Sequence, residues 1–223
     1  MEPNLKYKNK SIQVSCDGGA ATGKSTGAKL IANKYKLKFL SSGLLYRYAA
    51  LSIIKGKPKN RINFLKKKFK NFKLKNLKSL SLQAPNVSKF TAEIAKIKKI
   101  RQILKKYQVD FSKKYKNCCI EGRDISTNIL PKSDVKFFFV CNLNTAAKRR
   151  FVELKKNNSD INFRDVKKSL KMRNILDKRR KNSPLLKHRD AIEIDTGKLN
   201  KREMQKEMSK HIDKIIKYKK YGN

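Results

Sequence analysis

The sequence predicts an α/β domain in three layers, with a central five-stranded parallel sheet and helices on both faces. Short runs rich in β-branched and aromatic residues alternate with segments of helical periodicity, a pattern typical of parallel sheets. A glycine-rich turn, residues 18–25, follows the first such run and leads into a helical segment. At 223 residues, the chain has the length of one elaborated domain.

The expected elements follow one another in the order that such a sheet requires. Apolar residues recur in alternating steps of four and three between positions 90 and 111, which predicts one continuous helix over 88–115. Asn200, with Glu203 three residues later, resembles a capping box at the start of the last helix. The five expected strands are 11–16, 38–40, 117–120, 135–141 and 191–194, and the other expected helices are 24–36, 43–55, 145–156, 163–181 and about 200–218.

Residues 56–85 interrupt this alternation. The segment is rich in lysine and has only brief apolar–polar alternation, as in Phe72-Lys73-Leu74. We therefore expect a small hairpin or a loop insert there.

The net charge of +41 first suggests a nucleic-acid partner, because basic side chains neutralise phosphates. However, 46 of the 58 basic residues are lysines spread along the whole chain, and asparagine and isoleucine are also abundant. A/T-rich codons produce this bias without selection for a partner. We therefore expect adventitious binding to polyanions and no specific nucleic acid.

Neither a membrane span nor a secretory signal is expected. The longest apolar run, residues 137–141, is far shorter than a span, and residues 1–10 are a polar, lysine-rich tail. The four cysteines lack the paired spacing of a zinc site, so we expect buried free thiols in a reducing compartment, the cytoplasm. They are Cys16, Cys118, Cys119 and Cys141.

The turn after the first strand fits the eight-residue phosphate-loop pattern G-x-x-x-x-G-K-[ST]. Its backbone N–H groups and the following helix N-terminus suit a phosphate, Lys24 would bridge the β- and γ-phosphates, and the Ser25 hydroxyl would hold Mg²⁺. The loop reads Gly18-Gly19-Ala20-Ala21-Thr22-Gly23-Lys24-Ser25, followed by Thr26.

A phosphate loop indicates a nucleotide but not a reaction. The Asn-Lys-x-Asp run with which GTPases recognise guanine is absent, since no Asn-Lys pair, such as those at Asn33 and Asn200, continues in this way. Motor-type ATPases need a longer chain. The length therefore favours a small-molecule kinase.

Two strand ends offer an acceptor pocket, because ligands of parallel sheets gather at the C-terminal ends of the strands. The second strand leads into Ser42, Tyr46 and Arg47, and the third ends in Glu121-Gly122-Arg123-Asp124. Taken alone, each segment is equally well explained by helix capping or by a surface ion pair.

The helix expected over 163–181 changes along one face from apolar residues to Arg173, Asp177 and Arg180. On a solvated surface this would be a self-neutralised triad, but beside a phosphate loop two arginines around a carboxylate could hold a phosphate and a ribose.

Arg149 lies in a basic run before the polar stretch 155–162. This stretch is either a mobile lid or an ordinary basic helix end.

These motifs together resemble the bacterial cytidylate kinases, the CMP/dCMP kinases among the nucleoside monophosphate kinases of P-loop architecture. The resemblance covers nearly the whole chain beyond the tail, and the Glu-Gly-Arg-Asp segment is its most specific part. The matching segments are Asp17 to Thr26, Ser42-Gly43 with Tyr46-Arg47, Glu121 to Thr127, Lys148-Arg149-Arg150, Arg173, Asp177, Arg180, Pro184-Leu185 and Asp195-Thr196.

The resemblance implies transfer of the γ-phosphate of ATP to CMP or dCMP, with Mg²⁺. It implies ATP contacts from residues 18–26 and Arg149, a role of Glu121 toward Mg²⁺ through water, and catalytic roles for Lys24, Arg123 and Arg180. The acceptor contacts that it implies are Ser42, Tyr46, Arg47, Arg101, Arg123, Asp124, Arg173, Asp177 and Arg180.

The chain departs from the family pattern at Ser41, where an aspartate is usual, and at Ala92, where some members place a base-contacting serine. We expect one kinase domain over 11–223, which binds small-molecule nucleotides and is monomeric. Its acceptor insert, at about 56–100, is abbreviated, and a lid lies at about 151–164. The alternatives are a monophosphate kinase for UMP or AMP and a basic RNA-binding protein.

Overall fold

The computed structural model describes residues 11–78, 82, 84–155 and 161–221. These divide into two compact units, one formed by Met1–Phe39 with Tyr115–Asn223 and the other by Leu40–Lys114. The predicted tail, 1–10, and residues 156–160 of the predicted lid lie outside the described residues. The predicted acceptor insert falls within the second unit.

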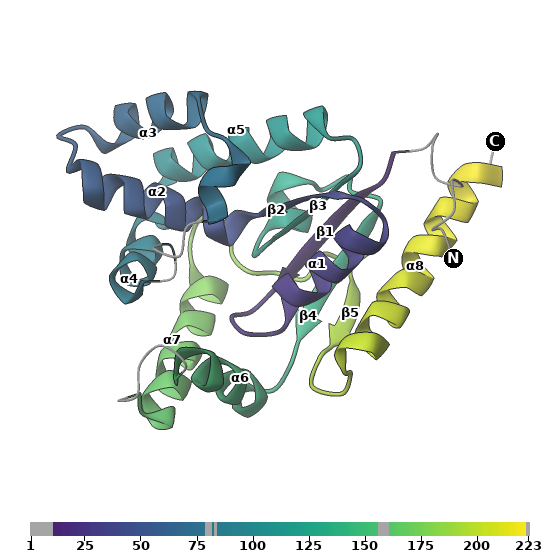
Figure 1. Ribbon diagram of the computed structural model, residues 1–223. Coiled ribbons are helices and arrows are strands. Elements are labelled where there is room, and N and C mark those ends of the chain that lie inside the picture. The colour runs from purple at the N-terminus through teal and green to yellow at the C-terminus, as the bar shows by residue number, and fades with distance from the viewer. Residues whose placement is uncertain (1–10, 79–81, 83, 156–160, 222–223) are drawn as a thin grey trace. The chain divides into compact units, whose positions relative to one another are not determined.

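The sheet of the first unit is parallel, as predicted, and has the strand order β2-β3-β1-β4-β5 (Figure 1). β1 is central: its Cys16 lies opposite Glu121 of β3 and Phe137 of β4. The phosphate loop leaves the C-terminal end of β1, beside the end of β3 with its Glu121. The strands are β1 (Gln13–Gly18), β2 (Lys38–Ser41), β3 (Cys118–Gly122), β4 (Val135–Val140) and β5 (Ile192–Asp195).

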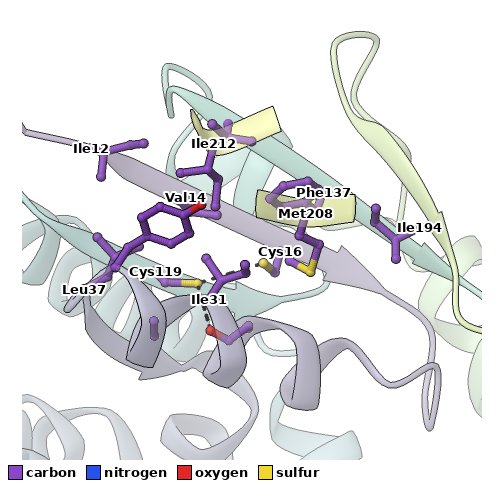
Figure 2. Packing of buried hydrophobic residues seen from close by; sticks show 14 of the residues in the cluster. Ile12, Val14, Cys16, Ile31, Leu37, Cys119, Phe137, Ile194, Met208 and Ile212 are labelled. Carbon is purple, nitrogen blue, oxygen red and sulfur yellow. Dashed lines mark hydrogen bonds between the residues drawn. The ribbon is translucent and has the colours of Figure 1, made fainter. Parts of the chain in front are cut away.

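One face of this sheet is covered by α1 (Lys24–Lys34) and α8 (Lys201–Tyr221). Figure 2 shows Ile31 of α1 and Met208 and Ile212 of α8 packed against side chains of the strands. Because the strand side chains alternate between faces, every second residue of β1 and β4 joins this core. The strand residues labelled there are Val14, Cys16, Cys119, Phe137 and Ile194.

A second apolar cluster joins the phosphate loop to a helix pair, α6 (Leu143–Lys155) and α7 (Phe163–Arg179). Ala20 of the loop packs with Ala146 and Ala147 of α6 and with Leu170 of α7. The loop is therefore held against α7, the helix on which the sequence predicted an arginine–aspartate face.

The second unit is helical. Its partly buried centre is an aromatic cluster in which Tyr48, Phe69, Phe72 and Tyr107 make edge-on and stacked contacts. Its elements are α2 (Ser42–Gly56), α3 (Arg61–Lys70), the 3₁₀ helix η2 (Leu74–Lys78), α4 (Pro85–Ile94) and α5 (Lys98–Lys114).

Two sequence expectations in this unit are wrong. The hairpin or loop expected over 56–85 is largely helical, because Asn60 caps α3 by accepting from Asn63 N (3.0 Å) and the face with Leu65 and Phe69 is buried. The single helix expected over 88–115 is two helices, α4 and α5. Arg101 donates to the Ala95 carbonyl at the end of α4 (3.3 Å), which satisfies a group left over by the break.

The four cysteines are free thiols, as expected, although Cys141 is only partly buried. Cys16 and Cys119 lie 3.9 Å apart between their sulfurs, in the core drawn in Figure 2. Burial raises the pKa of Cys118 to about 12, so this thiol is unreactive at neutral pH. Among the described residues, no helix combines the length and the apolar character needed to cross a membrane.

Candidate active site

The phosphate loop turns sharply between β1 and α1. Gly18 and Gly23 have positive φ angles of 156° and 77°. A Cβ at Gly18 would lie 2.6 Å from the Phe139 carbonyl oxygen, so only glycine lets the backbone pass β4 here. Gly23 is the N-cap of α1 and has no side chain with which to cap it. No side chain therefore caps the first N–H groups of α1, an arrangement typical of phosphate-binding helix N-termini.

Lys24 of the loop forms a buried ion pair with Glu121 at the end of β3. Its Nζ lies 3.0 Å from Glu121 Oε2, and the two side chains are 8% and 4% exposed. Burial lowers the pKa of Lys24 from its usual value and the positive charge of Arg123 lowers it further, while the charge of Glu121 opposes this. Glu121 thus holds the Lys24 side chain beside the loop and favours its charged form.

Three further side chains brace the loop from outside the motif. Asn174 of α7 accepts a hydrogen bond from Ala20 N (3.2 Å), and Thr196, after β5, donates to the Thr22 carbonyl (2.9 Å). Arg149 of α6 donates to the hydroxyl and to the carbonyl of Thr196, at 2.8 and 2.6 Å. Arg149, predicted as an ATP contact, is therefore connected to the loop through Thr196. Ser25 and Thr26 are exposed in the first turn of α1.

The predicted arginine–aspartate face of α7 is assembled with the segment that follows β3. Arg123 Nε lies 2.8 Å from one oxygen of Asp177, and Arg180 Nη1 lies 3.7 Å from the other. Arg180 also donates to the Ser183 carbonyl. Two guanidinium groups thus share one carboxylate, and planar guanidinium groups are suited to binding an anionic phosphate.

The charge of this cluster determines the ionisation of Asp177. Burial alone would raise its pKa, but the charge and hydrogen bond of Arg123, with the charges of Arg173 and Arg180, lower it below the usual value. The arginines therefore favour the ionised form of Asp177. Arg173 itself is exposed on α7.

Asp124 lies beside this cluster and is buried. Its Oδ1 is 3.6 Å from Arg180 Nη2, and its Oδ2 accepts from Asn128 Nδ2 (3.1 Å). Asn128 also donates to the Ser183 hydroxyl (3.0 Å). The Glu121–Asp124 segment thus supplies one group to the phosphate loop and two to the acceptor cluster, all within the first unit.

The other predicted acceptor residues belong to the second unit, where they make the following contacts. Arg47 donates to the Leu82 carbonyl (2.9 Å), and the buried Arg101 lies over the Tyr46 ring, 5.6 Å from its centre. Ser42 is buried at the start of α2. At the two departures from the family pattern, Ser41 caps α2 by accepting from Leu44 N (3.3 Å), and Ala92 is exposed on α4.

Sequence reasoning missed the side chains that brace the site. Asn174 stands next to Arg173 but carries no charge, and Asp17 was quoted only as part of the loop motif. Their roles depend on which segments meet in space, and spacing along one helix or strand does not report that. A polar residue in an otherwise buried strand, as at Asp17 in β1, was the one available signal.

This arrangement is suited to transferring a phosphoryl group. A loop for the β-phosphate, a buried lysine and a pair of arginines around a carboxylate provide positioning and charge compensation, which is most of what the reaction requires of a protein. Among the described residues, no three histidine, cysteine or acidic side chains gather as a metal-binding group.

Comparison with known proteins supports this interpretation of the site. Residues 14–214 match the family model described as cytidylate kinase. A cytidylate kinase of Clostridium botulinum is 37% identical over 83% of this chain and 90% of its own length. One of Fusobacterium nucleatum is 34% identical over 92% and 99%. A solved Eubacterium ventriosum protein, titled uncharacterized, shares the fold at a TM-score of 0.55 and 16% identity, covering 92% of this chain and 99% of its own.

Proposed function

The chain belongs to the cytidylate kinase family, and we propose that it transfers the γ-phosphate of ATP to CMP or dCMP. The products are ADP and CDP or dCDP. An oxygen of the acceptor's phosphate forms a bond to the γ-phosphorus, and the bond from that phosphorus to the β–γ bridging oxygen breaks.

The observation that carries this proposal is the contact between the phosphate loop and α7. Asn174 accepts from Ala20 N (3.2 Å), and Asp177, one turn further along the same helix, joins Arg123 and Arg180. The elements to which we assign the donor and acceptor phosphates are therefore directly connected within one unit. This is the proximity that an in-line transfer needs.

We assign the roles as follows. Lys24 compensates the charge that develops on the β- and γ-phosphates, and Arg123 and Arg180 hold the acceptor's phosphate. That phosphate is already ionised near neutral pH, so no side chain has to remove a proton. A donor phosphate oxygen would compete with Asn174 for the Ala20 N–H. We further assign the acceptor's ribose to Arg173 and Asp177, its base to Asp124 and Arg101, and other contacts to Ser42, Tyr46 and Arg47.

The residues present fit a magnesium ion bound mainly through nucleotide phosphates and water. Mg²⁺ in such sites takes only one or two protein ligands, and the exposed Ser25 hydroxyl follows directly on Lys24. Glu121 lies next to that lysine (3.0 Å) and could orient a water. When bound, the ion neutralises phosphate charge. The protein itself positions the phosphates through the loop and Lys24.

We assign Arg149 to the ATP side, since it is tied to the loop through Thr196. A lid at about 151–164 stays a proposal, as do a cytoplasmic location and a monomeric state. The free thiols favour a reducing compartment.

The proposal is tested by measuring ADP release from Mg·ATP with CMP, dCMP, UMP and AMP as separate acceptors. We expect activity with CMP and dCMP only. A Lys24→Ala preparation, purified in the same way, controls for contaminating kinases.

Comparable rates with UMP or AMP would retain the kinase but refute the assignment of the base to Arg101 and Asp124. No rate with any acceptor, together with RNA binding that survives about 0.2 M salt, would favour a basic RNA-binding protein.

A further inference from the structure

Asp17 is a buried carboxylate at the end of β1, directly before the phosphate loop, and the reaction does not use it. It accepts three hydrogen bonds, all from the segment that follows Arg123 and Asp124. The donors are Ile125 N (2.8 Å), Ser126 N (2.7 Å) and the Ser126 hydroxyl (2.6 Å). Each bond joins residues more than a hundred positions apart in the chain.

These bonds take the place of a local helix cap. Ile125 begins a short π-helical turn, η4 (Ile125–Ile129), and Asp124 is its N-cap residue but makes no side-chain cap bond. An aspartate at this position normally accepts from the first N–H groups of the helix. Here Asp17 accepts from them instead, across the sheet. The Asp124 carboxylate is thereby left to Asn128 and Arg180.

We propose that Asp17 is a positioning residue for the acceptor nucleotide: by capping η4 from β1, it fixes Arg123 and Asp124 relative to the phosphate loop and keeps the Asp124 carboxylate turned toward the acceptor cluster. The inference rests on the proposed function, because it concerns the acceptor contacts of that reaction. It assigns Asp17 no contact with the substrate.

The three hydrogen bonds that Asp17 accepts are suited to an ionised carboxylate, whose two oxygens only accept. Burial raises the pKa of Asp17 above its usual value, and the hydrogen bonds from Ser126 and Ile125 offset only part of this increase. An asparagine of the same shape would present an N–H₂ group to at least one N–H donor. It could therefore satisfy only part of the set, and the Ile125–Ser126 backbone would have to shift.

The test is Asp17→Asn, with Asp134→Asn as the matched control. Asp134 also accepts a β1 backbone N–H, from Gln13 at the opposite end of the strand (2.7 Å), and pairs with Lys219. We expect both variants to lose thermal stability, since each loses buried or partly buried hydrogen bonds. We expect only Asp17→Asn to reduce kcat/KM for CMP, by about ten- to a hundredfold, since small misplacements of a binding group cost this much. The KM for ATP should change by less than about twofold.

Ser126→Ala provides a milder second variant, since it removes the hydroxyl donor and keeps both backbone bonds. It should move CMP kinetics in the same direction by a smaller factor. If Asp17→Asn does not fold, the CMP kinetics of Ser126→Ala test the inference in its place. Amide hydrogen exchange at Ile125 and Ser126 should accelerate in Asp17→Asn and stay unchanged in Asp134→Asn.

Unchanged CMP kinetics in folded Asp17→Asn, or in Ser126→Ala if that is the only folded variant, would overturn the inference. So would equal losses for CMP and ATP. A wild-type protein inactive with every acceptor would instead refute the proposed function, and the two failures are therefore distinct.

Discussion

Arg123 and Arg180 of the first unit make different contacts from Arg47 and Arg101 of the second unit. In the first unit, charged groups pair with charged groups: Lys24 with Glu121, and Arg123 and Arg180 with Asp177. In the second unit, Arg47 and Arg101 donate to neutral backbone carbonyls. Bonds between charged partners in a partly buried site are stronger and fix direction, whereas a carbonyl can be exchanged for a ligand at little cost. The charge pairs therefore fix the direction of Arg123 and Arg180 more firmly than a bond to a carbonyl alone would.

The largest effect is expected at the charge on the phosphate loop. Lys24→Ala should reduce turnover by at least about a hundredfold, because it removes the charge that compensates the transferring phosphate. Steady-state ADP release measures it. Lys29→Ala, an exposed lysine of the same helix, is the control and should be near normal. Near-normal activity of Lys24→Ala would contradict the role of the loop.

Arg123→Ala should cost about 2–5 kcal/mol in kcat/KM for CMP, because a charged partner of the acceptor and of Asp177 is lost. Varying CMP and ATP separately locates the loss on the acceptor side. Arg179→Ala, an exposed arginine at the end of α7, should have little effect. If the two variants behave alike, the acceptor cluster is misassigned.

The pH dependence of stability should show the charge pairing of the first unit. The pKa of Asp177 lies below its usual 3.8 in the folded protein, so its contribution is complete above that value and is lost as pH falls through the lower, folded pKa. Asp177→Asn should therefore lower the free energy of unfolding by about 1–3 kcal/mol near pH 7. This deficit should shrink below pH 3.8. Urea unfolding at several pH values measures it, and a deficit that does not change with pH would count against an ionised Asp177.

The smallest effect is expected in the second unit. Arg101→Ala should lower the free energy of unfolding by about 1–2 kcal/mol, from a lost bond to the Ala95 carbonyl and a lost contact with the Tyr46 ring. Arg61→Ala, which removes an exposed arginine over Phe90, should cost less than about 0.5 kcal/mol. A loss at Arg101 well above about 2 kcal/mol would contradict this difference between the units.

Much of this site could be predicted from local patterns. Residues 18–25 were identified because a phosphate loop is one continuous turn whose glycines and lysine have fixed spacing. The face of α7 with Arg173, Asp177 and Arg180 was identified because helical spacing places those side chains together. The five strands were found to within a few residues, since buried parallel strands are short and rich in β-branched and aromatic residues.

The break between α4 and α5 could not be predicted in the same way. Residues 95–98 contain no glycine or proline, and the apolar spacing continues across them. The chain turns there because Ile94 and Ile100 are both buried, and the guanidinium of Arg101 can reach back to the Ala95 carbonyl. The helix over 61–70 was not predicted because, among its many lysines, only Leu65 and Phe69 are buried, and two buried positions are too few to show helical periodicity.

The sequence by itself determined the sheet, the loop and the acceptor face of α7, because in each case neighbours along the chain are neighbours in space. Tertiary structure alone decided which groups hold them: Glu121 beside Lys24, Asn174 on Ala20, and Asp17 on η4. Those pairs join residues about a hundred or more positions apart, so no spacing rule relates them. They form because burying a polar group in a packed interior requires a partner, and only the fold determines which partner is within reach.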